Sequence, residues 1–184
     1  MKMKRLVFFM LLFLVWFSGW GADWSEAQDH RAGQVVLGLD LGPALGTIDD
    51  TAFGLSISGD YYTSRNLSVG PLLQLAFTGD LTQVAVSGQL KYTFDVLEGN
   101  PFRPNVQAGL GFVTANHDNW LGSGTGSRSD TSYIVPVGLG FEYKVKAGFY
   151  LSATALLNFT NLDNSGGGKW QDSLSLMLGV RLPL

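Results

Sequence analysis

The feature that most constrains this chain is a strict alternation of apolar residues with small or polar ones. In the last eleven residues, a leucine or valine occupies every even position from Leu174 to Leu184, with Ser175 and Arg181 among the odd ones. A period of two places alternate side chains on opposite faces of a β-strand. Seven earlier segments between Gln34 and Phe159 repeat the pattern. We therefore expect eight strands, with the terminal strand sealing the sheet into an antiparallel up-and-down barrel.

The two faces of these strands differ in composition, and the difference indicates which face meets lipid. As registered here, the apolar face carries no Asp, Glu, Lys or Arg in any of the eight segments, and the opposite face is mostly Gly, Ser, Ala, Thr, Gln and Asn. An Arg or Lys facing lipid at the bilayer midplane costs ~2–4 kcal/mol. Charged residues are 15% of the chain, against roughly 25% in soluble domains. The all-β prediction is therefore a transmembrane barrel, with a soluble lipocalin-like periplasmic carrier as an alternative.

Aromatic residues fall at both ends of the predicted strands, as in the interfacial girdles of membrane barrels. We expect the first strand to start on the periplasmic side. One predicted girdle then lies at the periplasmic end and comprises Tyr61, Tyr92, Phe94, Phe102, Phe141, Tyr143, Phe149 and Tyr150. The other lies at the external end and comprises Phe53, Phe77, Phe112, Tyr133 and Phe159. External connections would include the two longest of the chain.

Six charged residues fall on the inward face, with three acids opposite three bases. They are Asp40, Asp60, Glu142, Lys91, Arg103 and Arg181. Because buried charges are costly unless they are paired, we expect an internal salt-bridge network weighted toward the periplasmic half. The interior of an eight-stranded barrel is just wide enough for side chains to fill. The barrel should therefore be plugged, with a narrow channel for ions or small solutes as the alternative.

The N-terminal region has the layout of an export signal. Lys2, Lys4 and Arg5 precede an apolar run, and small residues follow. The run is shorter than the ~20 residues of a spanning helix. We expect a signal peptide over 1–22, a short polar leader over 23–33 and the barrel over 34–184. The mature chain would carry a net charge of −6, which argues against a nucleic-acid partner, and the lack of cysteine excludes disulfides and a lipoprotein anchor.

Residues suited to catalysis are few. The two histidines are His30, in the polar leader, and His117, next to Asp118 and near Ser123. A Ser/His/acid hydrolase needs a rigid support, which the Gly/Ser-rich connection 115–130 does not offer. We expect no catalytic residue, no cofactor and no metal site. A lipid-modifying outer-membrane enzyme is the catalytic alternative.

Three segments resemble the small eight-stranded outer-membrane β-barrels of the OmpA/OmpX type. They are Val106–Phe112 (VQAGLGF), Val135–Tyr143 (VPVGLGFEY) and Leu178–Leu184 (LGVRLPL). The resemblance implies a monomer in the outer membrane with a structural or surface-interaction role, in contact with outer-membrane lipids and lipopolysaccharide and assembled by the barrel-insertion machinery. That machinery reads a terminal strand usually ending in Phe, where this chain has Leu184. Pro71 and Pro136 lie within strands, and we expect bulges or edge irregularities there.

Overall fold

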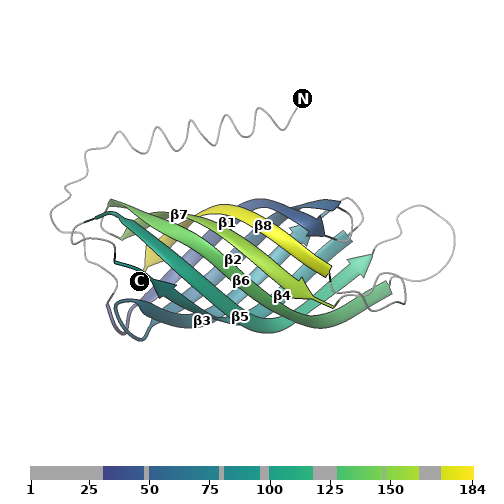
Figure 1. Ribbon diagram of the computed structural model, residues 1–184, viewed down its shortest axis with the longest axis horizontal. Coiled ribbons are helices and arrows are strands. Elements are labelled where there is room, and N and C mark those ends of the chain that lie inside the picture. The colour runs from purple at the N-terminus through teal and green to yellow at the C-terminus, as the bar shows by residue number, and fades with distance from the viewer. Residues whose placement is uncertain are drawn as a thin grey trace, which may run out of the picture.

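The described residues form a closed β-barrel (Figure 1). The computed structural model describes residues 31–47, 50–78, 81–95, 100–117, 128–146, 148–161 and 171–184. The strands are β1 Val35–Thr47, β2 Asp50–Tyr62, β3 Leu67–Phe77, β4 Leu81–Thr93, β5 Phe102–His117, β6 Arg128–Lys146, β7 Phe149–Thr160 and β8 Gln171–Pro183. No helix in the described ranges is long and apolar enough to cross a membrane.

Every strand pairs antiparallel with its neighbours in the chain, and β1 closes the barrel against β8. The closing register places Leu37 opposite Leu182, Leu41 opposite Leu178 and Leu45 opposite Leu174. The terminal strand is thus hydrogen-bonded along both edges, to β7 and to β1. The predicted eight-stranded antiparallel up-and-down barrel is confirmed.

The barrel has two different ends. We call the end where β1 begins and β8 finishes the terminal end, and the opposite one the loop end. The two longest connections, 118–127 and 161–170, both lie at the loop end, as expected. The expected bounds of the first connection, 115–130, were too wide, because β5 continues to His117 and β6 already begins at Arg128. Before the last strand, pairing begins at Gln171 of β8, which lies opposite Thr160 of β7. Backbone pairing continues through polar residues in which apolar and polar side chains no longer alternate, so the sequence pattern gave no sign of these strand ends.

The prolines interrupt the ladders without causing the expected bulges. Pairing of β2 with β3 skips the positions around Pro71, and pairing of β5 with β6 skips those around Pro136, yet the register is the same on both sides of each gap. Proline has no N–H to donate, which explains the missing pairs. The register shifts lie elsewhere, between Leu45 and Thr47 and between Lys144 and Lys146.

The two faces of the barrel follow the alternation of the sequence. Outward leucines are strongly exposed, with 66% of Leu110 and 67% of Leu139 accessible. Where strands extend past their expected bounds, they add the exposed charges Asp172 at the loop end and Lys146 at the terminal end. The inward face consists mainly of small and polar side chains, and it holds the chemistry described next.

Candidate functional site

A cluster of five buried charged residues lies inside the barrel. The members of this charge cluster are Asp40 on β1, Asp60 on β2, Lys91 on β4, Glu142 on β6 and Arg181 on β8. Each follows the inward parity of its strand, and each is at most 4% exposed. Five of the eight strands therefore place a charge in the same enclosed space.

Lys91 joins two of the acids. Its Nζ contacts Asp60 Oδ2 and lies 3.2 Å from Glu142 Oε1. The Nε2 of Gln89, also on β4, donates to Asp60 Oδ1 at 3.0 Å. Charge-assisted bonds of this kind offset part of the desolvation cost of the buried ions.

Arg181 holds the third acid and extends the cluster across the barrel. Its Nη1 donates to Asp40 Oδ2 at 2.8 Å, and its Nε lies 3.9 Å from Glu142 Oε1. Ser152 donates to Asp40 Oδ1 at 2.9 Å and Ser56 to Asp40 Oδ2 at 3.2 Å. Glu142 thus connects the Lys91 pair to the Arg181 pair, and a continuous series of polar contacts runs from β2 to β1 through the interior.

Two glycines make room for Arg181 and Asp40. A Cβ at Gly38 would collide with the Arg181 guanidinium and with Ser58 Oγ, and a Cβ at Gly179 would collide with the carboxylate of Asp40. Their lack of a side chain is therefore a steric requirement of the cluster.

Arg103, also expected in the interior network, lies apart from the cluster. It is buried and sits opposite Glu142 in the β5–β6 register, but its Nη2 pairs with Asp95 Oδ1 at 3.0 Å. Asp95 is 48% exposed and follows the end of β4. Within the described residues, Arg103 therefore forms its ion pair at the rim of the terminal end.

Two tyrosines lie inside the terminal end. Tyr62 and Tyr150 are both fully buried, and Lys144 Nζ lies 5.8 Å from the Tyr150 ring centroid. The prediction that Tyr150 belongs to the outer girdle is wrong. Tyr150 lies two residues before Ser152 on β7, so both side chains face the interior. Tyr62 was missed, although it shares the parity of Asp60. Strand parity would have placed both tyrosines correctly.

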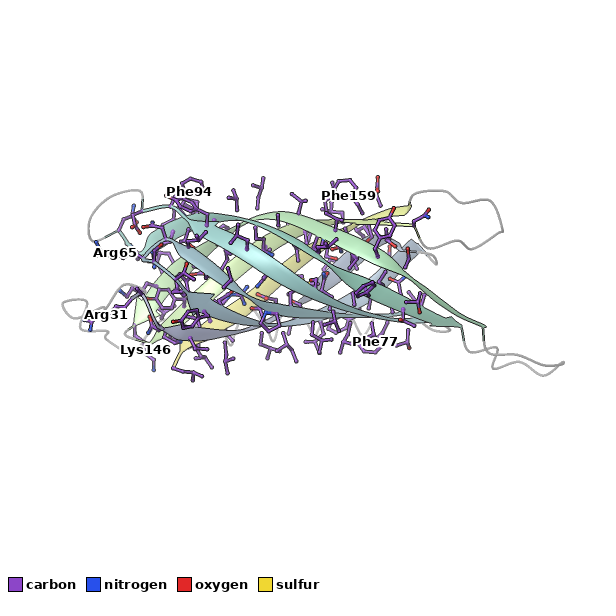
Figure 2. All side chains as sticks on the ribbon, turned by 90° about the horizontal axis from the view of Figure 1, so that it is seen from below. Arg31, Arg65, Phe77, Phe94, Lys146 and Phe159 are labelled. Atoms are coloured by element: carbon purple, nitrogen blue, oxygen red, sulfur yellow. The ribbon has the colours of Figure 1, made fainter. Side chains whose placement is uncertain are left out.

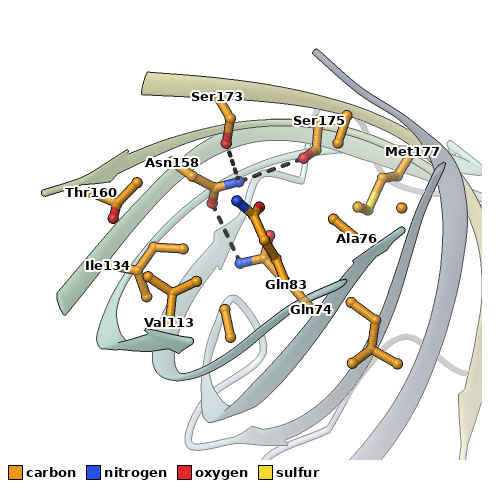
Figure 3. A pocket seen from close by; sticks show the side chains of 14 residues that line it. Gln74, Ala76, Gln83, Val113, Ile134, Asn158, Thr160, Ser173, Ser175 and Met177 are labelled. Carbon is orange, nitrogen blue, oxygen red and sulfur yellow. Dashed lines mark hydrogen bonds between the residues drawn. The ribbon is translucent and has the colours of Figure 1, made fainter. Parts of the chain in front are cut away.

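A pocket of about 40 Å³ occupies the interior toward the loop end (Figure 3). Amides and hydroxyls bond across it: Gln74 Nε2 donates to Asn158 Oδ1 at 3.4 Å, and Asn158 Nδ2 lies 3.5 Å from the hydroxyls of Ser173 and Ser175. A buried apolar group lies beside them and comprises Ala85, Val113, Ala115 and Ile134. The three members of this group other than Ala115 line the pocket, which therefore presents neutral polar and apolar surface.

The other expected girdle aromatics point away from the interior. Figure 2 shows Phe94 near the terminal end, with Arg31, Arg65 and Lys146, and shows Phe77 and Phe159 toward the loop end. Most members are strongly exposed, and Phe149 and Phe159 are partly covered by neighbours. Tyr92 and Phe94 pack edge to face, with ring centroids 5.0 Å apart.

The described residues contain no group of three His, Cys, Asp or Glu side chains able to hold a metal ion. The side chains of His117, Asp118 and Ser123, which were considered for a Ser/His/acid hydrolase, lie outside the part of the chain whose side chains are described, and so does His30.

Comparisons with known proteins agree with this geometry. Residues 15–181 match the family described as the outer membrane protein beta-barrel domain. Neisserial surface protein A (NspA) is similar, with a TM-score of 0.62 at 20% identity over 81% of this chain and 95% of that one. The N-terminal β-barrel domain of Pseudomonas aeruginosa OprF follows at 0.60 and 17%, over 84% and 100%. No curated protein sequence matches the chain.

A third similar structure is Ail, the attachment invasion locus protein of Yersinia pestis. Its TM-score is 0.54 at 14% identity, over 82% of this chain and 97% of that one. At these identities, the likeness to solved structures shows the fold alone.

Proposed function

Because the chain belongs to the outer membrane protein beta-barrel domain family, we propose that it is a non-catalytic outer-membrane barrel, plugged inside, with a structural or surface-interaction role. The observation that carries this proposal is the charge cluster, whose members come from five strands and meet in the interior. A cluster of this kind fills the lumen of a barrel that has little room to spare.

The plug consists of paired charges. Lys91 and Arg181 each face two carboxylates and share Glu142, so moving Lys91 aside would take the cation from Asp60, and moving Arg181 aside would take it from Asp40. The cost of such an uncompensated charge is several kcal/mol. Opening the lumen to an aqueous path would therefore require several ion pairs to break together.

The outer surface supports placement among lipids on all sides. Its exposed leucines form an apolar band, and the aromatic residues lie toward the two ends. In this proposal the loop end meets lipopolysaccharide and the terminal end faces the periplasm. The barrel is a monomer that the barrel-assembly machinery inserts.

A surface-interaction role would belong to the loop end. The two longest connections, 118–127 and 161–170, both lie there. Ail, one of the similar barrels, is named for attachment and invasion, and a comparable contact role here is part of the proposal.

Residues 1–22 serve as the signal peptide in this proposal, 23–33 as a polar leader and 34–184 as the barrel. The end of the leader is attached to the barrel, since Gly33 N donates to Tyr62 O at 2.8 Å. The intact mass of the protein from an outer-membrane fraction tests the division, because a mass that retains residues 1–22 would contradict it.

Conductance tests the plug directly. The purified, refolded protein is added to a planar lipid bilayer, with a large-pore porin as the positive control. We expect no steady large conductance, and a steady large conductance would contradict the plugged barrel. The second candidate, a narrow channel for small solutes, is favoured by the pocket toward the loop end and would give small single-channel steps instead.

A further inference from the structure

Besides the apolar group beside the loop-end pocket, three large apolar side chains lie around a second, smaller cavity of the interior, among small and polar ones. They are Leu72 on β3, Leu156 on β7 and Met177 on β8, which are 3%, 2% and 3% exposed. We call them the apolar collar. An inward-facing apolar group is unexpected on the polar face of a membrane barrel, so its position calls for a functional explanation.

The apolar collar lies between two internal spaces. All three residues line a central cavity of about 10 Å³, together with Asp40, Lys91 and other polar side chains of the interior. Met177 also lines the larger pocket toward the loop end (Figure 3). Met177 therefore lies between the loop-end pocket and the central cavity, which residues of the charge cluster also line.

The collar reaches well beyond its own strands. A Cβ at Gly138 on β6 would lie 2.8 Å from Leu156 Cδ2, and a Cβ at Gly54 on β2 would lie 3.0 Å from Met177 Cε. The two side chains thus extend over glycines of other strands. The collar side chains come from β3, β7 and β8 and extend over β6 and β2, so the collar involves five of the eight strands.

Part of the pocket lining is accessible from the loop end. Gln83 and Ser173 of the pocket lining are only half-buried, whereas the collar and the charge cluster are buried. At the terminal end the fully buried Tyr62 and Tyr150 close the interior. Water thus has its shorter route to the charge cluster from the loop end, past the collar.

We propose that the apolar collar is the barrier that keeps water and small solutes of the loop-end pocket away from the charge cluster. The inference rests on the proposed plugged barrel and identifies its outer seal. A hydrophobic constriction excludes water by dewetting, and a cavity of about 10 Å³ is at the lower limit for one water molecule. Excluding bulk water strengthens the ion pairs beneath the collar, because attraction between charges rises as the local dielectric constant falls.

The test uses cysteine accessibility, because the chain has no native cysteine. Ser58→Cys reports on the central cavity below the collar, and Ser173→Cys, at a half-buried position, reports on the pocket above it. Each variant is placed in lipid nanodiscs, and the rate of reaction with 2-aminoethyl methanethiosulfonate is measured by mass spectrometry. A shift between boiled and unboiled samples on a denaturing gel verifies that each variant is folded.

Met177→Ala should open the collar. We expect it to speed labelling of S58C by roughly tenfold or more, because removing the side chain hydrates the constriction. The matched control Met177→Leu should leave S58C protected, and S173C should react quickly in all backgrounds. Leu156→Ala provides a second opening variant should M177A fail to fold.

The outcomes separate the collar from the plug. Rapid labelling of S58C in the otherwise unchanged barrel would contradict the plugged barrel itself. Protection of S58C in both M177A and L156A, with S173C reactive, would overturn the collar and leave the plug intact. Slow labelling of S173C would also overturn the inference, since the pocket would then not be the route of access.

Discussion

Replacing Lys91 with methionine removes the cation on which two buried acids depend. Methionine keeps much of the apolar stem but lacks the ammonium group that contacts Asp60 Oδ2 and lies 3.2 Å from Glu142 Oε1. Asp60 then loses its ion pair with Lys91, and Glu142 loses the closer of its two cations, since Arg181 Nε lies 3.9 Å from its Oε1. Removing one partner of a buried ion pair costs about 3–5 kcal/mol. Because Lys91 serves two carboxylates, we expect a loss in the upper part of that range.

The loss is measured as the free energy of unfolding in urea titrations of the protein refolded into lipid. The matched control is Lys146→Met, an exposed lysine at the end of β6, which should change the free energy by at most ~0.5 kcal/mol. Adding Asp60→Asn to Lys91→Met should recover ~1–3 kcal/mol, because one uncompensated charge disappears. If K91M unfolds with the same free energy as K146M, the account of the charge cluster as a set of mutually dependent charges is refuted.

Two further substitutions test the interior and the outer face. Gly179→Ala should cost ~1–3 kcal/mol through overpacking against Asp40, whereas Gly88→Ala, whose Cβ meets nothing within 4 Å, should be neutral in the same urea titration. Leu110→Arg on the lipid-facing surface should lower the free energy of unfolding by ~2–4 kcal/mol. Thr131→Arg, at an exposed position near the loop end, should lower it by less. Equal losses of stability at the two positions would argue against a lipid-facing band.

The alternation of the sequence was sufficient to predict the barrel because each strand keeps one register with each neighbour over most of its length, and parity then sets each side chain inside or outside. Asp40 and Arg181 are an example, because strand parity alone predicts that both side chains face the interior. The β1–β8 register then places them close together, and Arg181 Nη1 lies 2.8 Å from Asp40 Oδ2. The lack of charge on the outer face similarly predicted which side meets lipid.

Parity could not predict how far a long side chain reaches along the barrel. Arg103 faces inward as parity requires, yet it pairs with Asp95 beyond the end of β4, where no strand period exists. The collar was missed for a different reason. Leu72 and Met177 lie on the inward parity, but an apolar residue there gives no signal of its own until the strands around it are registered.

The central claim is that even-numbered residues of β8 face lipid while odd-numbered ones face a closed interior. A nitroxide scan from Leu174 to Leu182 tests it, because single cysteines can be introduced into a chain that has none. We expect collisions with lipid-soluble oxygen to peak at 174, 176, 178, 180 and 182, and the odd positions 177, 179 and 181, at and below the collar, to be reached by neither oxygen nor a water-soluble nickel complex. Even positions shielded from oxygen, with odd positions open to the nickel complex, would contradict the account.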